Sequence, residues 1–286
     1  MKLGELLERT YRAIHDDIVD GVATGGDATT IIDSSLSGKY QANKFKNWIA
    51  FITRTDNGLS PQGRYGIISA YVGTGTATIS SIADSVQAGD EYSFCKGSVP
   101  LYTLTKLCND ALKGLGRIPL VDTSLTLAAS TIRYTLPAVI KGKRPDYIYF
   151  REPTTFRRFP APNWDIEPAA SGSPATLVFK KQNIYATGIS NVFQPLVGYT
   201  IVIHYQGYHE PLTAYSSPVN ETIHDNLAVA ACVLEAFKWK AFPRQKKIDV
   251  ANWQTAKQDF EEKKSLHPIE RPIRDEHTLN IGIFNR

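Results

Sequence analysis

Four segments of the chain carry apolar residues at helical spacing. The first leads into the glycine-rich stretch "DGVATGGDATT", where we expect its helix to stop, and contains Leu3, Leu7, Tyr11, Ile14 and Ile18. The second follows Ser98 and Pro100 and runs from Leu101 to Leu115, with Gly114 and Gly116 placed to end it. Both patterns predict amphipathic helices with one buried side.

The third and fourth helical segments lie near the end of the chain. The third starts at Ser217 and Pro218, a favourable cap and first position, and extends to about 241. Its middle, residues 227–237, is apolar nearly all round apart from Glu235, so we expect it at the centre of a helical cluster. We expect the fourth helix to begin with Asp249 as its cap and to end before Pro268. Asp259 and Lys263 are four residues apart in it and can form an ion pair.

Two β-rich blocks separate these helices. The first holds five short runs between turn clusters: "TTIID", "NWIAFITR", "RYGIISAYVG", "TATISS" and "EYSFCK". Five strands in so short a stretch predict a small β-barrel at residues 23–98. The second block, residues 119–212, has "TIRYTLP", "DYIYFRE", "ATLVFKK" and "YTIVIHYQGY" as its clearest strands, with many prolines between them, and a β-sandwich-like domain is the simplest interpretation.

The sequence therefore predicts an α+β protein. A small helical bundle is assembled from residues 1–22, 99–118 and 213–267; it carries the inserted barrel and the sandwich-like domain. Residues 268–286 remain as an extended C-terminal arm, because two prolines oppose a helix there. The arm is too apolar for a solvated tail, and we expect it to bind a partner through Ile269, Ile273, Leu279, Ile281, Ile283 and Phe284, with Arg271 and Arg274 at the rim. A fold-back of the arm over the chain's own helical bundle stays open as the alternative.

Composition narrows the classes of protein. The longest apolar run, "LAVAACVLEAF", is shorter than a membrane span and contains a glutamate, and the N-terminal segment lacks a secretory signal, so we expect a protein made in a cytoplasm and no membrane partner. Cys95, Cys108 and Cys232 are too few and scattered for a disulfide framework, which suggests small core residues. A net charge of +4 neither demands nor excludes a polyanion.

The sequence lacks the common catalytic and metal-binding patterns. No phosphate-loop, zinc-protease or nucleophile-elbow string occurs, and the "GTGT" between two predicted strands is better explained by a hairpin turn. His204 and His209 are five residues apart in a predicted strand, hence on opposite faces, which favours structural histidines over a shared metal. The sequence predicts no catalytic residue, metal or cofactor.

One region concentrates basic and aromatic residues. Tyr147, Tyr149, Phe156 and Phe159 are interleaved there with cations, of which we single out Lys141, Lys143, Arg144, Arg157, Arg158, Lys180 and Lys181 as a face for DNA or a partner. Charged and aromatic residues in alternation also describe a half-exposed pair of strands, and that interpretation stays open.

Several segments together resemble the head-to-tail connector proteins (adaptor or neck proteins) of tailed bacteriophages. The helical part of the resemblance lies in "GELLERTYRAIHDD", "LYTLTKLCNDALKGLG" and "NETIHDNLAVAACVLEAFKWKAF". The β part lies in "GRYGIISAYVGTGTATIS", "AGDEYSFCKG" and "STIRYTLP", which are similar to modules of phage structural proteins. The resemblance covers most of the chain and is one of plan, without a diagnostic signature.

The resemblance implies a virion protein of the neck. Such proteins form a ring, usually dodecameric, that joins the portal protein to tail or nozzle proteins and lets double-stranded genomic DNA pass through its lumen without sequence specificity. It implies no catalytic residue. Two rival hypotheses remain: a tail or baseplate protein whose β modules bind host-surface carbohydrate, and an enzyme such as a hydrolase with a non-standard site.

Overall fold

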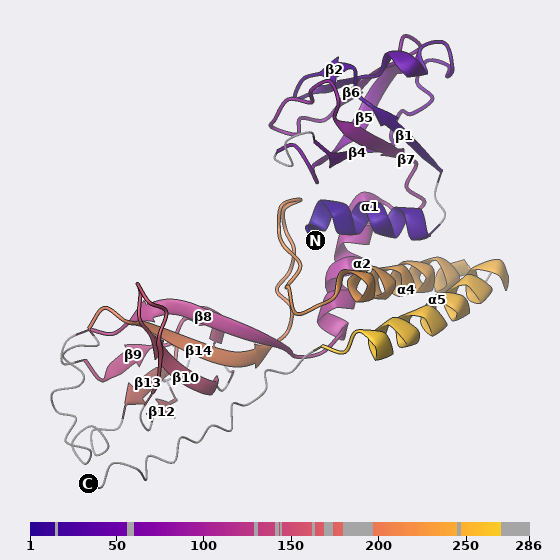
Figure 1. Cartoon of the computed structure of the whole chain (residues 1–286). Helices are drawn as coiled ribbons and strands as arrows, with labels where there is room; N and C mark the ends of the chain where they lie inside the picture. Colours follow the sequence, from indigo (N-terminus) through magenta and orange to yellow (C-terminus); the bar gives the residue numbers. More distant parts are fainter. Residues whose placement is uncertain are drawn as a thin grey trace, which may run out of the picture. The chain divides into compact units, whose positions relative to one another are not determined.

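The computed structural model describes residues 1–14, 17–55, 60–128, 131–140, 143, 145–161, 164–168, 174–179, 197–244 and 247–269, without the side chains of residues 243, 244, 247 and 248. These residues form two compact units. The first combines Met1–Gly116 with His209–Ile269, and the second begins at Arg117 and ends at Tyr208. The described chain is mixed α+β, with four α-helices and three antiparallel sheets (Figure 1).

The helices of the first unit surround one central member. They are α1 (Leu3–Ala13), α2 (Leu101–Gly114), α4 (Asp225–Arg244) and α5 (Lys247–Leu266). Helix α4 packs against each of the other three, and Ala228, Cys232 and Ala236 on it are fully buried. This confirms the central position predicted from its apolar surface, which only a helix with neighbours on several sides can bury.

Three predicted helix boundaries differ from the structure. Helix α5 begins at Lys247, so Asp249 lies in its first turn and is not its cap. Tertiary pairing explains the other two. Helix α1 ends at Ala13, because Ile18–Val22 forms strand β1 and pairs with β7. Helix α4 begins at Asp225 rather than at Ser217, because the residues around Pro218 pair with the N-terminus of the chain. Leu3 N donates to Ser217 O and Val219 N donates to Met1 O, so these backbone groups are already used.

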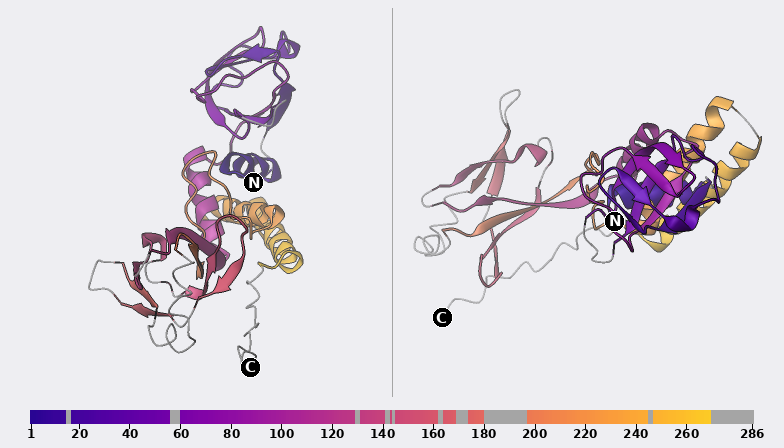
Figure 2. Two further views of the ribbon diagram at one scale, coloured as in Figure 1. Left: turned by 60° about the vertical axis from the view of Figure 1, so that its left-hand side comes forward. Right: turned by 90° about the horizontal axis from the view of Figure 1, so that it is seen from above.

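A seven-stranded antiparallel sheet occupies the rest of the first unit. Its order is β1-β7-β4-β5-β6-β3-β2, and Figure 2 shows how strongly it curls. The five predicted strands are present as β3 (Thr30–Ile32), β4 (Ile49–Arg54), β5 (Tyr65–Val72), β6 (Thr76–Ile79) and β7 (Glu91–Cys95). Strands β1 and β2 (Gly25–Gly26) were not predicted and form the two edges; no pairing between the described strands closes the sheet into a barrel.

The interior of this sheet contains a buried carboxylate. Asp33, 1% exposed, precedes a short 3-10 helix (Ser34–Leu36) and accepts hydrogen bonds from Ser35 N at 2.8 Å and from the Tyr92 hydroxyl at 2.7 Å. Burial raises the pKa of Tyr92 far above its usual range, and the hydrogen bond to Asp33 raises it further. The hydroxyl therefore stays protonated and serves Asp33 as a permanent donor.

We predict that Tyr92→Phe lowers the free energy of unfolding of the first unit by about 2 kcal/mol, because it leaves a buried carboxylate oxygen without its donor. Tyr71→Phe is the matched control, since Tyr71 is equally buried but donates to the neutral carbonyl of Leu36 at 3.3 Å. Its expected cost is about 1 kcal/mol or less. Urea denaturation of both variants tests the difference, and equal losses would contradict the role given to Asp33.

The second unit contains two antiparallel sheets that share one core. The first has the order β11-β10-β14-β8 and the second β12-β13-β9. Their bounds are β8 (Ile118–Thr126), β9 (Arg133–Thr135), β10 (Pro145–Arg151), β11 (Arg158–Pro160), β12 (Trp164–Glu167), β13 (Thr176–Phe179) and β14 (Thr200–Gly207). Phe150 of the first sheet meets Phe179 of the second with ring centres 5.4 Å apart, and both are buried in a common cluster. The four strands predicted for this block are therefore present.

Candidate functional site

Aromatic and basic side chains gather on one face of the four-stranded sheet in the second unit. Tyr147 of β10 lies directly opposite His204 of β14, so their side chains share a face, and their rings stack with centres 4.0 Å apart. Tyr149 follows two residues later on the same side, 6.1 Å from Tyr147. Arg158 of β11 places its guanidinium carbon 5.2 Å from the Tyr149 ring centre. We call Tyr147, Tyr149, His204 and Arg158 the aromatic–basic face.

The electrostatics of this face keep its histidine neutral. Burial lowers the pKa of His204, the charge of Arg158 lowers it further, and Asp146 opposes both. Among the described residues, neither His204 Nε2 nor Asp146 Oδ2 has a hydrogen-bond partner, although both atoms are buried. A proton added to His204 would place a second cation beside Arg158, so the imidazole contributes a neutral stacking surface.

We predict that the second unit loses stability as the pH falls from about 6.5, the ordinary pKa of an unfolded histidine. Stability falls in this direction because the pKa of His204 is lower in the folded chain than in the unfolded chain. At acid pH the unfolded chain therefore binds a proton that the folded chain does not bind. Amide hydrogen exchange of β10 and β14 at several pH values measures the effect, and His204→Gln should flatten the dependence. An unchanged slope in that variant would show that another group is responsible.

The cations predicted from the sequence do not all join this face. Arg157 and Arg158 are adjacent and exposed, and Arg158 pairs with Arg151 across β10 and β11, so positive charge collects at this edge of the sheet. Lys143 instead lies 5.0 Å from the ring centre of Tyr205, which alternates with His204 and points into the core. Lys141, Arg144, Lys180 and Lys181 lie outside the described residues.

The predicted partner-binding arm falls almost entirely outside the described part of the chain. Ile269 is described and is half-buried just beyond the end of α5. The remaining predicted contacts lie beyond it: Arg271, Ile273, Arg274, Leu279, Ile281, Ile283 and Phe284.

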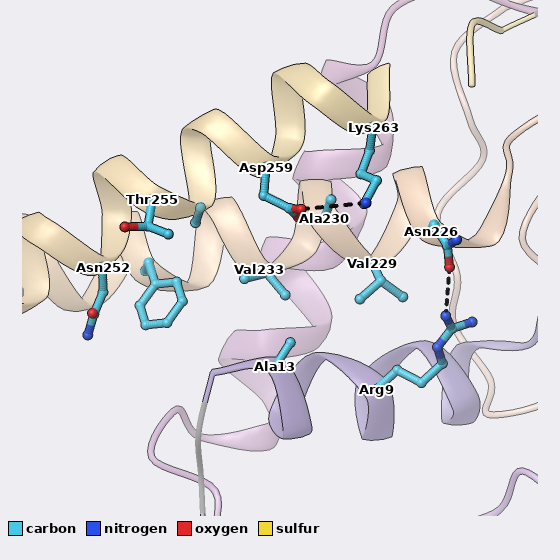
Figure 3. Close-up of a pocket in the computed structure, with 12 residues that line it drawn as sticks. Arg9, Ala13, Asn226, Val229, Ala230, Val233, Asn252, Thr255, Asp259 and Lys263 are labelled. Carbon is cyan, nitrogen blue, oxygen red and sulfur yellow. Dashed lines mark hydrogen bonds and ion pairs between the residues drawn. The ribbon is translucent and has the colours of Figure 1, made fainter. Parts of the chain in front are cut away.

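A second candidate site lies on the helices of the first unit. A groove of about 330 Å³ runs along α4 between α1 and α5, as Figure 3 shows. Its floor is apolar and comes from Val229, Ala230, Val233 and Phe237 of α4 together with Ala256 of α5. We call this hollow the helical groove. It arises because α4 is apolar on more sides than α1, α2 and α5 cover.

Polar side chains form the rim of the helical groove. At one end Arg9 donates a hydrogen bond to the Asn226 amide oxygen at 3.0 Å, and Lys263 approaches Asp259 at 3.8 Å (Figure 3). The second contact confirms the pair predicted from spacing in the fourth helix. At the other end of the rim lies Asn252. An apolar floor with a polar rim suits an apolar segment whose backbone or ends need polar partners.

Sequence reasoning missed parts of both sites. The sequence predicts only a structural role for His204, because its ring partner Tyr147 is far away in sequence and only the strand register joins them. The sequence hints at the helical groove only through the apolar surface of residues 227–237. The walls of the groove come from segments far apart in the sequence, so their meeting could not be predicted. His209 lies beyond the end of β14 at Gly207 and not within the strand as predicted, but it has the structural role expected of it: Asn220 N donates to His209 Nε2 at 3.0 Å.

Other features of the described part of the chain bear on metal binding, on its cysteines and on membrane spans. It holds no group of three or more His, Cys, Asp or Glu side chains arranged for a metal ion. Cys95, Cys108 and Cys232 are buried and unbridged, as predicted for core residues. The "GTGT" stretch turns the chain between the antiparallel strands β5 and β6, as expected. Of the helices described, none has the length and apolar character needed to cross a bilayer.

Comparison with known proteins does not place the chain in a family, because no protein-family model matches it and no curated protein is significantly similar to it in sequence.

Proposed function

We propose that this protein is a virion structural protein, a head-to-tail connector whose copies form a ring, usually dodecameric in this class, between the portal and the tail. Its place is the neck of the virion, and double-stranded genomic DNA passes through the lumen of the ring. Portal protein on one side and tail or nozzle proteins on the other are its partners. The proposal has its origin in the resemblance of the sequence segments and gains support from the surfaces described above.

The observation that carries the proposal is the poor burial of α5. Of the side chains described on this helix of twenty residues, only Ala256 is buried, and its extensive packing is with α4. Trp253 meets Phe242 with ring centres 5.5 Å apart, yet Phe242 is 60% exposed. A long, poorly buried outer helix next to exposed aromatic side chains of α4 is typical of a subunit that buries more surface on assembly.

The charge on the second unit fits the passage of DNA. Arg151, Arg157 and Arg158 concentrate positive charge at one edge of a sheet, and such cations would contact the phosphates of DNA, which carry no sequence information. Lys141, Arg144, Lys180 and Lys181, which lie outside the described residues, are proposed to belong to the same DNA or partner face, whereas Lys143 does not join it.

We also propose that the first unit contains a β-barrel and that the second unit is a β-sandwich. We infer a barrel in the first unit because β1 and β2, at opposite edges of the sheet, are joined by only Ala23 and Thr24. Ala23 N donates to Asp90 O beside β7, and Thr24 N donates to Ile32 O of β3, so one bent segment contacts both edges. The shared core of the two sheets in the second unit supports a sandwich.

Two measurements test the connector proposal. Electron microscopy of the protein mixed with portal complexes should show a ring of fixed copy number on the portal. Removal of residues 267–286 should then weaken attachment, because we propose that the arm docks on the portal or on a neighbouring subunit. Particles that never form rings, with or without portal, would overturn the proposal; full attachment by the shortened chain would remove only the role of the arm.

One observation favours a second function, a tail or baseplate protein that binds host-surface carbohydrate. The stacked rings of Tyr147 and Tyr149 are the kind of platform on which sugar rings pack. A glycan-binding screen of the intact protein tests this function. Binding that Tyr149→Ala removes, in a protein that forms no ring with portals, would favour it over the connector.

A further inference from the structure

We propose that the helical groove binds the chain's own C-terminal segment, residues 279–284, in the free subunit. The groove is an apolar hollow on α4 with room for a narrow chain, and residues 279–284 read "LNIGIF", with four apolar side chains. Neither the connector function nor the carbohydrate-binding alternative is needed for this inference.

The dimensions of groove and segment agree. Asn252 and Lys263, which mark the two ends of its α5 wall, are eleven positions apart in the helix, or about 16 Å at 1.5 Å per residue. Residues 279–284 in extended form span five steps of about 3.3 Å, again about 16 Å. An extended segment can therefore lie along the whole groove and place alternate side chains on its floor.

The described chain ends close to the groove, which favours docking of the residues that follow. Helix α5 ends at Leu266, close in sequence to Lys263 at one mouth of the groove. Residues 270–278 provide nine residues, at most about 30 Å of chain, for the reversal that brings residue 279 to this mouth. A segment attached so near its binding site has an effective concentration on the order of millimolar, which favours the same chain over a second copy.

Charged residues at one mouth of the groove favour one orientation of the docked segment. Arg9 and Lys263 stand at the mouth near the end of α5, together with Asn226 (Figure 3). Asp275 and Glu276 precede the apolar segment by three residues or so and reach this mouth when residue 279 enters the groove. Arg9 forms an ion pair with Asp225 at an N–O distance of 3.9 Å, and Lys263 forms one with Asp259 at 3.8 Å. Both ion pairs are long and leave room for another carboxylate. Residues 279–284 would then run from Lys263 toward Asn252.

The docked segment would cover the apolar surface of α4 that α1 and α5 leave exposed. Val229, Val233 and Phe237 contribute side chains to the groove floor, and the isoleucines of the segment are apolar groups that can pack on them. Each buried methylene contributes about 0.8 kcal/mol, enough for several side chains to offset the ordering of a short chain segment.

A nitroxide label on the full chain tests the proposal. The three native cysteines are buried, so Asn285→Cys supplies the reactive thiol for the label, and methyl NMR signals of Val229 and Val233 report its approach. We expect these signals to be lost at low protein concentration. A label at the exposed loop position of Lys39, on the sheet of the same unit, is the matched control and should leave them intact.

Two further samples make the outcome decisive. The double variant Ile281→Asp, Ile283→Asp, carrying the same label, should recover the signals because its charged side chains cannot enter an apolar groove. An equal mixture of labelled chains and isotope-enriched unlabelled chains should show no loss, since the contact is within one chain. Intact signals in the labelled chain would overturn the proposal, and loss in the mixture would assign the groove to a neighbouring copy instead.

Discussion

Replacing Phe45 by alanine is expected to lower the free energy of unfolding of the first unit by about 3–5 kcal/mol, the usual range for a large aromatic removed from a core. Phe45 is fully buried, and its ring centre lies 4.8 Å from Tyr71, 5.1 Å from Trp48 and 5.2 Å from Phe94. The alanine variant leaves a cavity where all these rings meet.

The backbone around Phe45 explains why the cavity should not collapse. Asn43 and Asn47 adopt left-handed conformations, with φ of 60° and 67°, and their amides donate to Tyr71 O and Ile68 O of β5. Asparagine tolerates this region better than most residues, so the loop is held in place on both sides of Phe45. The fixed loop cannot move inward to fill the space.

Urea denaturation measures this loss, with Tyr102→Ala as the control. Tyr102 is 84% exposed on α2, so its removal should change the free energy of unfolding by no more than about 0.5 kcal/mol. A Phe45→Ala variant within about 1 kcal/mol of the original protein would show that the aromatic cluster does not hold the sheet together.

Gly4→Ala is expected to destabilise the contact between α1 and the sheet by about 3 kcal/mol, at the upper end of the cost of overpacking. A Cβ on Gly4 would overlap the carbonyl oxygen of Gly63, which is backbone and cannot rotate away. Gly63 N donates to Ile52 O of β4 at 2.8 Å, so the strand holds this loop in position. Helix α1 would have to leave its place.

The separation of α1 from the sheet has visible consequences. Tyr11 of α1 donates to Val99 O at 2.7 Å and lies 6.1 Å from the Phe51 ring of β4, and both contacts weaken if the helix moves. Amide exchange should therefore accelerate in α1 and β4 together. The control is Gly114→Ala at the end of α2, where a Cβ meets nothing within 4 Å. That variant should be neutral or slightly stabilised by helix propensity; similar losses in both variants would refute the argument.

Local spacing determined most of the secondary structure. The stripe of α2 and the apolar middle of α4 predicted helices because positions three and four apart share a side in any helix, whatever surrounds it. The β-branched and aromatic runs between turn residues predicted β3–β7 and four strands of the second unit for the same local reason. The aromatic and basic character around Tyr147 and Arg158 was also visible as composition.

Tertiary structure alone decided the features that depend on partners distant in sequence. Ile18 fits the stripe of α1 but belongs to β1, because β7 supplies hydrogen bonds that a longer helix would lose. The capping pattern of Ser217 and Pro218 is genuine, yet pairing with residues 1–3 takes those backbone groups first. His204 meets Tyr147, and Arg9 meets Asn226, through strand register and helix packing that no local pattern encodes. A spacing rule describes one element; which neighbour completes its hydrogen bonds and covers its apolar side is settled by the whole chain.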